Sequence, residues 1–378
     1  MQTPNVCPIC QSDKFIVLLA LKVPVYPFIT SKSDINDSAF GLLKVVRCSS
    51  CGHLFNSNYD SKNRQKQYGA KLTNVPTHGG MHAAFDDVVT FIGDKTLRSR
   101  QVVEVGAGSG QLARLIARTA KHVLLFEPSV ALSRSLVPEA NIEIINDYFS
   151  ASRLASPVDL VICRQVLEHV ESPAGFFQDL SNALKPDAIL YLEVPSAEFI
   201  EEKKCIFDFH YAHVQYFHKS GIEFLAAAAG FSLEKSTSIK EGHDTAFLFR
   251  KTGSRVKLTK KPITGGFDAG WIELKRIGLR EQLVKLPQPL AIYGATAHGQ
   301  SFISFFDTDI RIETAFDDTP GNWDSFMYSC NQVVPVRNFS QTANHPETII
   351  ITAYLHDSVI RKKLYEAGFQ GTVFSIKP

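Results

Sequence analysis

The chain has 378 residues, more than one ordinary hydrophobic core uses, so we expect two or three domains. Hydrophobic residues make up 44% and charged residues 21%, a globular composition that excludes a disordered or fibrous protein. Forty basic and thirty-eight acidic residues give a formal charge of +2, and the longest basic cluster is the short stretch 257–261, so the charge gives no support to a nucleic-acid-binding or membrane-surface role.

The first residues do not have the pattern of a targeting signal. Residues 1–11 are polar and lack the basic-then-apolar order of a signal peptide, and no apolar run approaches the length of a membrane span. We expect a cytoplasmic protein, a monomer or a small homo-oligomer, with no membrane or nucleic-acid partner.

Two Cys-x-x-Cys pairs stand near the start, Cys7-Pro-Ile-Cys10 and Cys48-Ser-Ser-Cys51. Each pair places two thiolates on one tight turn, and four such ligands complete a tetrahedral zinc shell. A redox-active pair is the alternative, but redox chemistry needs only one Cys-x-x-Cys. The odd total of seven cysteines also argues against a disulfide framework. We expect structural Zn²⁺ in a zinc ribbon, because four protein ligands leave no coordination position open.

A strand, a glycine-rich turn and a helix follow one another over residues 101–118. The apolar run 101–105 contains Glu104 and ends in Gly106-Ala-Gly-Ser-Gly110, after which leucine and isoleucine recur at helical spacing. Glycines here let the backbone approach a ligand at the carboxyl end of a strand, where open α/β sheets bind their ligands. Dinucleotide enzymes share such a turn, so this feature alone leaves an NAD-dependent enzyme open.

The next strands continue the alternation of strands and helices. Residues 122–126 form an apolar strand followed by Glu127, and residues 144–146 form another that leads to Asp147. A carboxylate after the second strand can accept both hydroxyls of a ribose. A fourth strand at 159–163, a helix at 174–184 and a fifth strand at 189–194 complete a pattern that predicts a parallel sheet.

This order of elements, with VLEHV at 166–170 and LKPDAILYLEVP at 184–195, closely resembles the class I methyltransferases that use S-adenosylmethionine (SAM). Their first turn reads E/D-x-G-x-G-x-G. The resemblance implies that Glu127 binds the SAM ribose, that Asp147 meets the adenine amino group and that His169 packs beside the methionine moiety. The cofactor positions that it implies are Glu104, Gly106, Ala107, Gly108, Gly110, Glu127, Pro128, Asp147, Tyr148, Arg164, Gln165 and His169.

The zinc segment, the SAM domain and a third α/β domain together resemble the sugar C-methyltransferases that act on nucleotide-linked deoxy-ketosugars. That family carries H-E-H-x-x-Y-F, and residues 207–217 match it at His213, Tyr216 and Phe217. Tyr211 stands in place of the first histidine and Ala212 in place of the glutamate. Residues 242–245 read Gly-His-Asp-Thr instead of the family's HGGS, so we expect an altered substrate.

The resemblance implies a catalytic role for His213, Tyr68 and Tyr216. Methylation at carbon requires removal of a proton beside a ketone, and an imidazole with a pKa near neutrality can act as that base. A tyrosine hydroxyl can then stabilise the enolate oxygen. An O-methyltransferase acting on a small polar metabolite, and a SAM-binding protein that has lost turnover, stay open as alternatives.

The last third of the chain predicts a second Rossmann-like α/β unit. Residues 252–266 have the composition of a linker, and residues 268–284 predict a helix. Strands at 290–294, 310–316 and 348–352, with helices from 300 and over 358–367, predict a small parallel sheet. By resemblance this unit lines the substrate cleft, and the substrate positions that we assign are Tyr211, Tyr293, Ala295, His298 and Asp317.

The predicted architecture is therefore α/β: a zinc-binding segment at 1–75, a class I SAM methyltransferase domain at 76–252 and a carboxyl-terminal Rossmann-like domain at 253–378. The expected cofactors are SAM and structural Zn²⁺, and the expected substrate is a nucleotide sugar.

Overall fold

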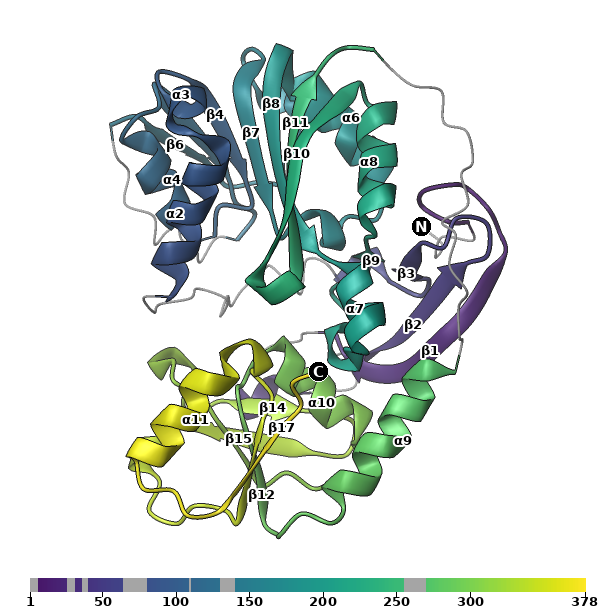
Figure 1. Cartoon of the computed structure of the whole chain (residues 1–378), viewed down its shortest axis with the longest axis vertical. Coiled ribbons are helices and arrows are strands. Elements are labelled where there is room, and N and C mark those ends of the chain that lie inside the picture. The colour runs from purple at the N-terminus through teal and green to yellow at the C-terminus, as the bar shows by residue number, and fades with distance from the viewer. Residues whose placement is uncertain are drawn as a thin grey trace.

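A computed structural model describes residues 6–25, 31–35, 40–63, 80–108, 110–129, 140–254 and 270–378 of the chain. Three sheets organise these residues, and Figure 1 shows two α/β units one above the other, with the amino-terminal strands along one side of both. Within the described residues, no helix combines the length and the apolar character that crossing a membrane requires.

The central unit is built on a sheet of seven strands in the order β10-β11-β8-β7-β4-β5-β6. Strands β4 to β8 form parallel pairs, and β11 pairs antiparallel with both β8 and β10, so six strands run in one direction and only β11 in the other. The order of the parallel strands is that of the doubly wound nucleotide-binding folds. Their bounds are β4 (Gln101–Val105), β5 (His122–Phe126), β6 (Ile142–Ile145), β7 (Val158–Arg164), β8 (Leu184–Pro195), β10 (Phe231–Ile239) and β11 (Asp244–Lys251).

Helices cover both faces of this sheet because its strands carry apolar side chains on both sides. Val103 points into a core formed with α6 (Pro173–Ala183) and α8 (Lys219–Ala228). Val102, its neighbour, points into the opposite core formed with α2 (Gly80–Ile92) and α4 (Gln111–Ala117). The short helix α3 (Asp94–Leu97) connects α2 to β4.

The carboxyl-terminal unit has six strands in the order β14-β15-β13-β12-β16-β17. All neighbours are parallel except β14, which pairs antiparallel with β15 at the edge. The small parallel sheet expected from the sequence is present. Its elements are α9 (Trp271–Leu283), β12 (Leu290–Tyr293), α10 (Ala297–Phe305), β13 (Thr314–Phe316), β14 (Phe326–Tyr328), β15 (Val333–Arg337), β16 (Thr348–Ile351), α11 (Asp357–Glu366) and β17 (Thr372–Ser375).

Two predicted boundaries in this unit are wrong. Helix α10 begins at Ala297 and not at residue 300, because the Thr296 side chain accepts a hydrogen bond from the Gly299 amide and caps the helix one turn earlier. Strand β13 begins only at Thr314, four residues after the predicted start, because Ile310 and Ile312 are buried outside the sheet.

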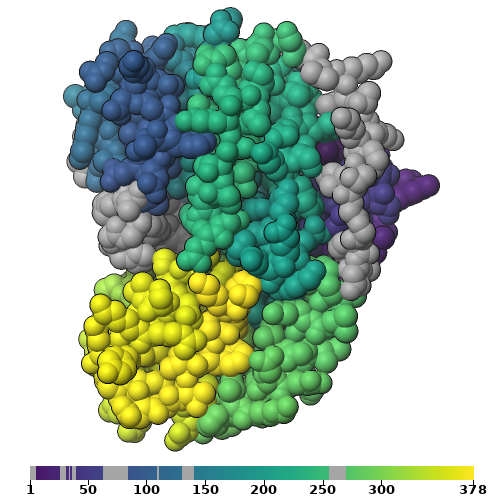
Figure 2. Space-filling view, in the orientation of Figure 1, coloured from purple at the N-terminus to yellow at the C-terminus, as the bar shows by residue number. Residues whose placement is uncertain are grey.

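A third sheet joins the beginning of the chain to its middle. Strands β1 (Phe15–Pro24), β2 (Phe40–Cys48) and β3 (Leu54–Asn56) are antiparallel, and β9 (Gln215–Tyr216) adds a fourth strand beside β3. Apolar side chains of β1 and β2 share one core with residues 197–216, which include helix α7 (Ala197–Lys203), and with the carboxyl-terminal unit. In Figure 2 the carboxyl-terminal unit, in yellow and light green, lies directly against the teal part of the chain.

Candidate functional site

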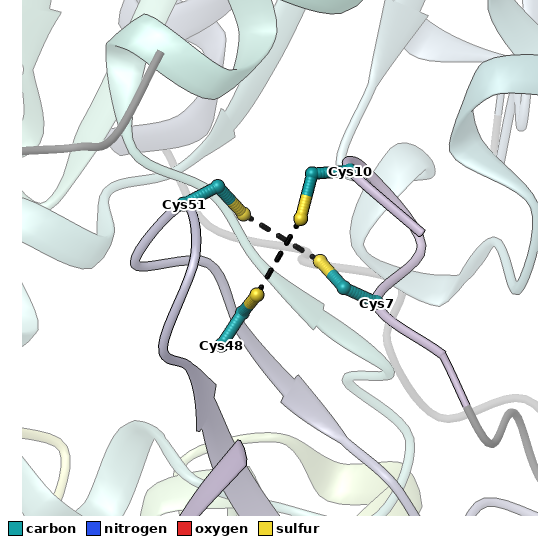
Figure 3. Close-up of side chains that lie close together, drawn as sticks. All are labelled: Cys7, Cys10, Cys48 and Cys51. Atoms are coloured by element: carbon teal, nitrogen blue, oxygen red, sulfur yellow. Dashed lines mark hydrogen bonds between the residues drawn. The ribbon is translucent and has the colours of Figure 1, made fainter. Parts of the chain in front are cut away.

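The four cysteines of the two Cys-x-x-Cys pairs meet in the structure, and their sulfurs point toward one centre (Figure 3). The sulfurs of Cys7 and Cys51 are 3.6 Å apart and those of Cys10 and Cys48 are 3.5 Å apart. Tetrahedral zinc with bonds of about 2.3 Å separates its sulfurs by about 3.8 Å, close to these spacings. All four side chains are buried, so the arrangement fits a closed structural ion.

Both cysteine turns have the same backbone geometry. The residue after each pair, Gln11 or Gly52, has a positive φ, 61° and 75° respectively. Its amide donates to the carbonyl of the first cysteine of the pair, at 3.0 Å for Cys7 and 2.9 Å for Cys48. The Ser50 amide also donates to the Cys48 sulfur at 3.4 Å. Such turns point backbone N–H groups toward thiolates, which favours the charged ligand form.

The glycine-rich turn follows β4 as predicted, and its glycines meet different surroundings. Gly106 has φ 71°, and a Cβ built there would lie 2.5 Å from a methyl carbon of Val166. Gly108 has φ 54°, and a Cβ there would have no atom of the described residues within 4 Å. Gly110 caps helix α4 in the left-handed conformation. The open space beside Gly108 is therefore where a ligand can approach the backbone.

Two buried glutamates flank this turn. Glu104 lies in β4, and among the described residues no group donates to its Oε2. Burial raises the pKa of Glu104 to about 8, although Arg164 acts to lower it. Glu127 follows β5 and accepts hydrogen bonds from the Gly108 amide at 2.8 Å and the Ser129 amide at 2.9 Å. Burial also raises the pKa of Glu127, and these two amides oppose that shift.

These two carboxylates fit the SAM cofactor expected from the sequence. SAM carries an ammonium group and two ribose hydroxyls, which are the partners that a solvent-excluded carboxylate needs. Two further predicted cofactor residues belong to the same loops: Ala107 follows Gly106, and Pro128 follows Glu127.

Asp147 and Tyr148 follow β6 at the surface. The Asp147 side chain is 40% exposed and pairs with Arg153, and its Oδ1 accepts the Tyr148 amide at 2.8 Å. The Tyr148 side chain is also exposed. Both side chains are therefore accessible to an adenine. Their role in binding the cofactor stays a prediction.

Arg164 and Gln165, at the end of β7, belong to a buried network of charges. Arg164 Nε lies 2.6 Å from Glu193 Oε2, and Gln165 Nε2 donates to Glu193 at 3.2 Å and to Asp244 at 2.8 Å. Lys240 pairs with both carboxylates. Gln165 has φ 52°, a costly conformation that this network holds in place. The network gives Arg164 and Gln165 a structural role beside the turn.

His213 lies in a cluster of histidines. Its ring centroid is 3.7 Å from that of His210 and 5.0 Å from that of His169, whose Nδ1 is 2.8 Å from the carbonyl of Ala212. Burial, with the neighbouring His210 and His169, holds the pKa of His213 well below its usual value. In these surroundings His213 therefore lacks the near-neutral pKa that we expected from the sequence.

A carboxylate that the sequence analysis did not select stands beside His213. Donor atoms of Glu168, His169 and His213 all lie within 4.8 Å of one another. Glu168 is buried, no other described residue donates to its oxygens, and burial raises its pKa to about 8. Ala212 removes the carboxylate neighbour in sequence, but Glu168 supplies one in space. Only the fold brings it there, because the two residues are far apart along the chain.

The hydroxyls of two of the predicted tyrosines, Tyr216 and Tyr211, form hydrogen bonds within the protein. The Tyr216 hydroxyl donates to the His210 carbonyl at 3.3 Å, and the ring is buried 6.2 Å from the His213 ring. The Tyr211 hydroxyl accepts the Asp60 amide at 3.1 Å, and its ring packs on Tyr59. Tyr68 lies outside the described residues.

The predicted substrate residues of the carboxyl-terminal unit fall into two groups. Asp317 accepts the amides of Ala295 and Thr319 and the side chain of Asn322, at 2.9 to 3.0 Å, so it organises loops. The Tyr293 hydroxyl donates to Asp318 at 2.6 Å. The sequence analysis assigned all of these positions to the substrate, and that role stays a prediction; His298 hydrogen-bonds to Asp208 of the central unit.

His298 contacts Asp208, a buried residue that the sequence analysis did not select. Asp208 Oδ1 is 2.8 Å from His298 Nε2 and 3.0 Å from His243 Nε2, and the Tyr354 hydroxyl donates to Oδ2 at 3.0 Å. Burial raises the pKa of Asp208, but the two imidazoles outweigh it and hold that pKa far below its usual value. No sequence signal joins these residues, because each comes from a distant segment.

The comparisons with known proteins cover the central unit. Residues 78–236 match the model of a methyltransferase domain family. A mitochondrial ubiquinone biosynthesis O-methyltransferase of Schizosaccharomyces pombe is 33% identical over 105 residues, 26% of this chain and 38% of that protein. A tRNA 5-carboxymethoxyuridine methyltransferase of Escherichia coli K12 is 30% identical over 116 residues, 28% of this chain and 43% of that protein.

This chain thus spans less than half the length of these curated relatives. Among solved structures, a cyclopropane synthase of Mycobacterium tuberculosis aligns with a TM-score of 0.38 and 14% identity over 48% of this chain and 87% of that chain. The family match and the strand order of the central sheet agree with the glycine turn and its two glutamates. Residues 78–236 therefore form a class I SAM-dependent methyltransferase domain.

Proposed function

We propose that this chain transfers the methyl group of SAM to a carbon atom of a nucleotide-linked deoxy-ketosugar, with His213 as the general base. In the same proposal the four cysteines hold a structural zinc ion. The observation that carries the proposal is the solvent-excluded Glu104, whose Oε2 has no donor among the described residues and which flanks the turn with open space at Gly108. A ligand with a positive charge and a close backbone contact satisfies both features.

The chain's own groups bind and orient the cofactor. SAM supplies an electrophilic methyl group on a sulfonium when it is bound. Glu104 accepts the ammonium group, which restores its ionised form, because a neighbouring cation lowers the pKa of a carboxyl. Glu127 accepts the ribose hydroxyls while the Gly108 and Ser129 amides hold its carboxylate in place.

His213 is neutral in these surroundings, which is the form that accepts a proton. It removes the proton beside the substrate ketone, and the electron pair of that C–H bond forms the enolate, whose carbon would take the methyl group while the S–CH3 bond breaks and S-adenosylhomocysteine leaves. Glu168, within 4.8 Å of His213, has a pKa raised by burial, and the imidazolium that results would favour its ionised form, which in turn stabilises that cation as the carboxylate of a catalytic triad does. This spatial neighbour supports a base role for His213 despite Ala212.

O-methylation is the second candidate, because the curated relatives of the central domain include ubiquinone biosynthesis O-methyltransferases. In that reaction His213 would deprotonate a hydroxyl in the same position. The formal charge of +2 does not favour an RNA acceptor such as that named for the Escherichia coli relative.

Deuterium exchange separates the two reactions. The protein is incubated in D2O with S-adenosylhomocysteine and a panel of nucleotide-linked ketosugars, and mass spectrometry follows the sugar. C-methylation predicts deuterium at the carbon beside the ketone, whereas O-methylation predicts none. With SAM in place of the product analogue, the same panel reports methyl transfer as a gain in substrate mass.

The variant His213→Ala should lose exchange and transfer while its SAM affinity, measured by calorimetry, stays within about twofold, since the imidazole acts on the acceptor. The matched control is His345→Ala, an exposed imidazole of the carboxyl-terminal unit. Full turnover in His213→Ala would refute the base, and no affinity for SAM would refute the whole proposal. Retained affinity without product across the panel would favour a SAM-binding protein that has lost turnover.

A further inference from the structure

We propose that Asp208, His243 and His298 form a binding site for a divalent first-row transition-metal ion between the central and carboxyl-terminal units. One donor atom from each lies within 4.8 Å of the others. The site is separate from the four cysteines, and the inference does not depend on methyl transfer.

The three donors come from three elements that converge on one point. Asp208 ends the short 3-10 helix Ile206–Asp208, His243 precedes β11, and His298 lies in the first turn of α10. Both Nε2 atoms face the same carboxylate oxygen, at 3.0 and 2.8 Å. An ion in tetrahedral geometry with bonds of about 2.0 to 2.2 Å separates neighbouring ligand atoms by about 3.3 to 3.6 Å, so each nitrogen would have to move about 0.3 to 0.8 Å from the oxygen to admit it.

Outer contacts orient these donors in the way that metal ligands require. His243 Nδ1 lies 2.6 Å from Asp244 Oδ1, which directs the Nε2 atom toward Asp208. Metal-binding histidines commonly hold a carboxylate through the other ring nitrogen in this way. The Tyr354 hydroxyl donates to Asp208 at 3.0 Å, and the Tyr354 ring packs 4.6 Å from that of His298.

The charge balance of the surroundings favours a cation. Three buried carboxylates, Asp208, Asp244 and Glu193, face two permanent cations, Arg164 and Lys240, and the imidazole of His243, which contacts both aspartates and carries the third positive charge when it is protonated. A bound divalent ion would take the place of that proton and compensate the same carboxylates. Two imidazoles among three donors select zinc, iron or cobalt over magnesium and calcium. Three protein ligands also leave a coordination position open.

The competing interpretation is a metal-free hydrogen-bonded network that joins the two units. The two interpretations differ in how many ions the chain binds. The full-length protein is produced in zinc-depleted medium supplemented with Co²⁺, so that Co²⁺ can occupy both sites, and is analysed for metal content by mass spectrometry. The proposal predicts one Co²⁺ per chain that shows no thiolate-to-metal charge-transfer band, in addition to the ion at the cysteines, which shows one.

Variants assign that ion to its ligands. Asp208→Asn and His298→Ala should each lose the Co²⁺ without thiolate absorption, whereas the matched control His345→Ala keeps it. Asp244→Asn, which alters only the outer contact, should raise the dissociation constant by about 10- to 100-fold. Thermal unfolding and the thiolate band of each variant show whether it has folded.

The absorption spectrum of the wild-type protein gives a result even if a variant does not fold. A wild-type chain whose every Co²⁺ shows thiolate charge transfer would overturn the proposal, as would full retention of the other Co²⁺ in a folded Asp208→Asn. The thiolate-to-metal charge-transfer band distinguishes the two ions. If the cysteines bound no Co²⁺, the Co²⁺ at Asp208, His243 and His298 could therefore still be detected.

Discussion

The substitution Glu127→Gln tests the cofactor site most directly. Glu127 is buried after β5, and its two oxygens accept the Gly108 and Ser129 amides. A ribose bound there adds hydrogen bonds to the same ionised group, and such charge-assisted bonds contribute about 1.5 to 3 kcal/mol. Glutamine keeps the shape but loses the charge, and its NH2 group faces one of the two amides.

We therefore expect Glu127→Gln to weaken SAM binding by about 1.5 to 3 kcal/mol, which is about 10- to 150-fold in the dissociation constant. Isothermal titration calorimetry measures the dissociation constant of SAM, and circular dichroism checks that the variant is folded. The control Glu143→Gln changes a carboxylate on the neighbouring strand β6 that is 63% exposed, and it should bind SAM like the wild type. Equal affinities of the two variants would refute the placement of the ribose.

Three further predictions address the turn and the metal. The pKa of Glu104 in the folded protein, about 8, exceeds its ordinary 4.5, so the folded state loses stability as the pH rises through this interval. At pH 8 without SAM, Glu104→Gln should therefore have a free energy of unfolding about 2 to 4 kcal/mol above that of the wild type, measured with a chemical denaturant. A difference no larger at pH 8 than at pH 5 would contradict the burial argument. Gly108→Ala should lose SAM affinity at least tenfold, with about 1 kcal/mol of stability lost to its positive φ. Gly106→Ala adds a clash with Val166 to the same strain and should lower the melting temperature further, and the reverse order would be inconsistent with the turn geometry. Cys48→Ser should lose zinc and melt at a lower temperature than Cys330→Ser, a control at an exposed cysteine; equal zinc content would argue against the cysteine site.

The central sheet was predictable because its signals are local. The alternation of apolar strands with helical patterns, and the glycine turn after 101–105, each lie within a few residues of sequence. The cysteine cluster was predictable for a similar reason, since each pair forms its own turn and only the meeting of the two pairs needed the fold. The start of α10 was missed because a single capping threonine decided it.

The charged clusters were not predictable from the sequence. Asp208, His243 and His298 are brought together by packing between two units, and no spacing rule connects them. Glu168 lies inside a segment that the sequence analysis used only for family resemblance. It stands out only in the structure, where its buried oxygens have no hydrogen-bond donor among the described residues. The low pKa of His213 likewise follows from burial, and then from neighbouring imidazoles, which a linear pattern does not contain.

Strand β9 has a consequence for how the protein can be divided. It pairs with β3 directly after the second cysteine pair, the Asn56 amide donates to the Val214 carbonyl at 2.9 Å, and His53 Nε2 lies 2.7 Å from Gln215 Oε1. A fragment cut at the start of the methyltransferase homology would leave the backbone next to His213 without these partners. Any expression fragment or chimera intended to retain the arrangement of that loop must therefore include the amino-terminal sheet.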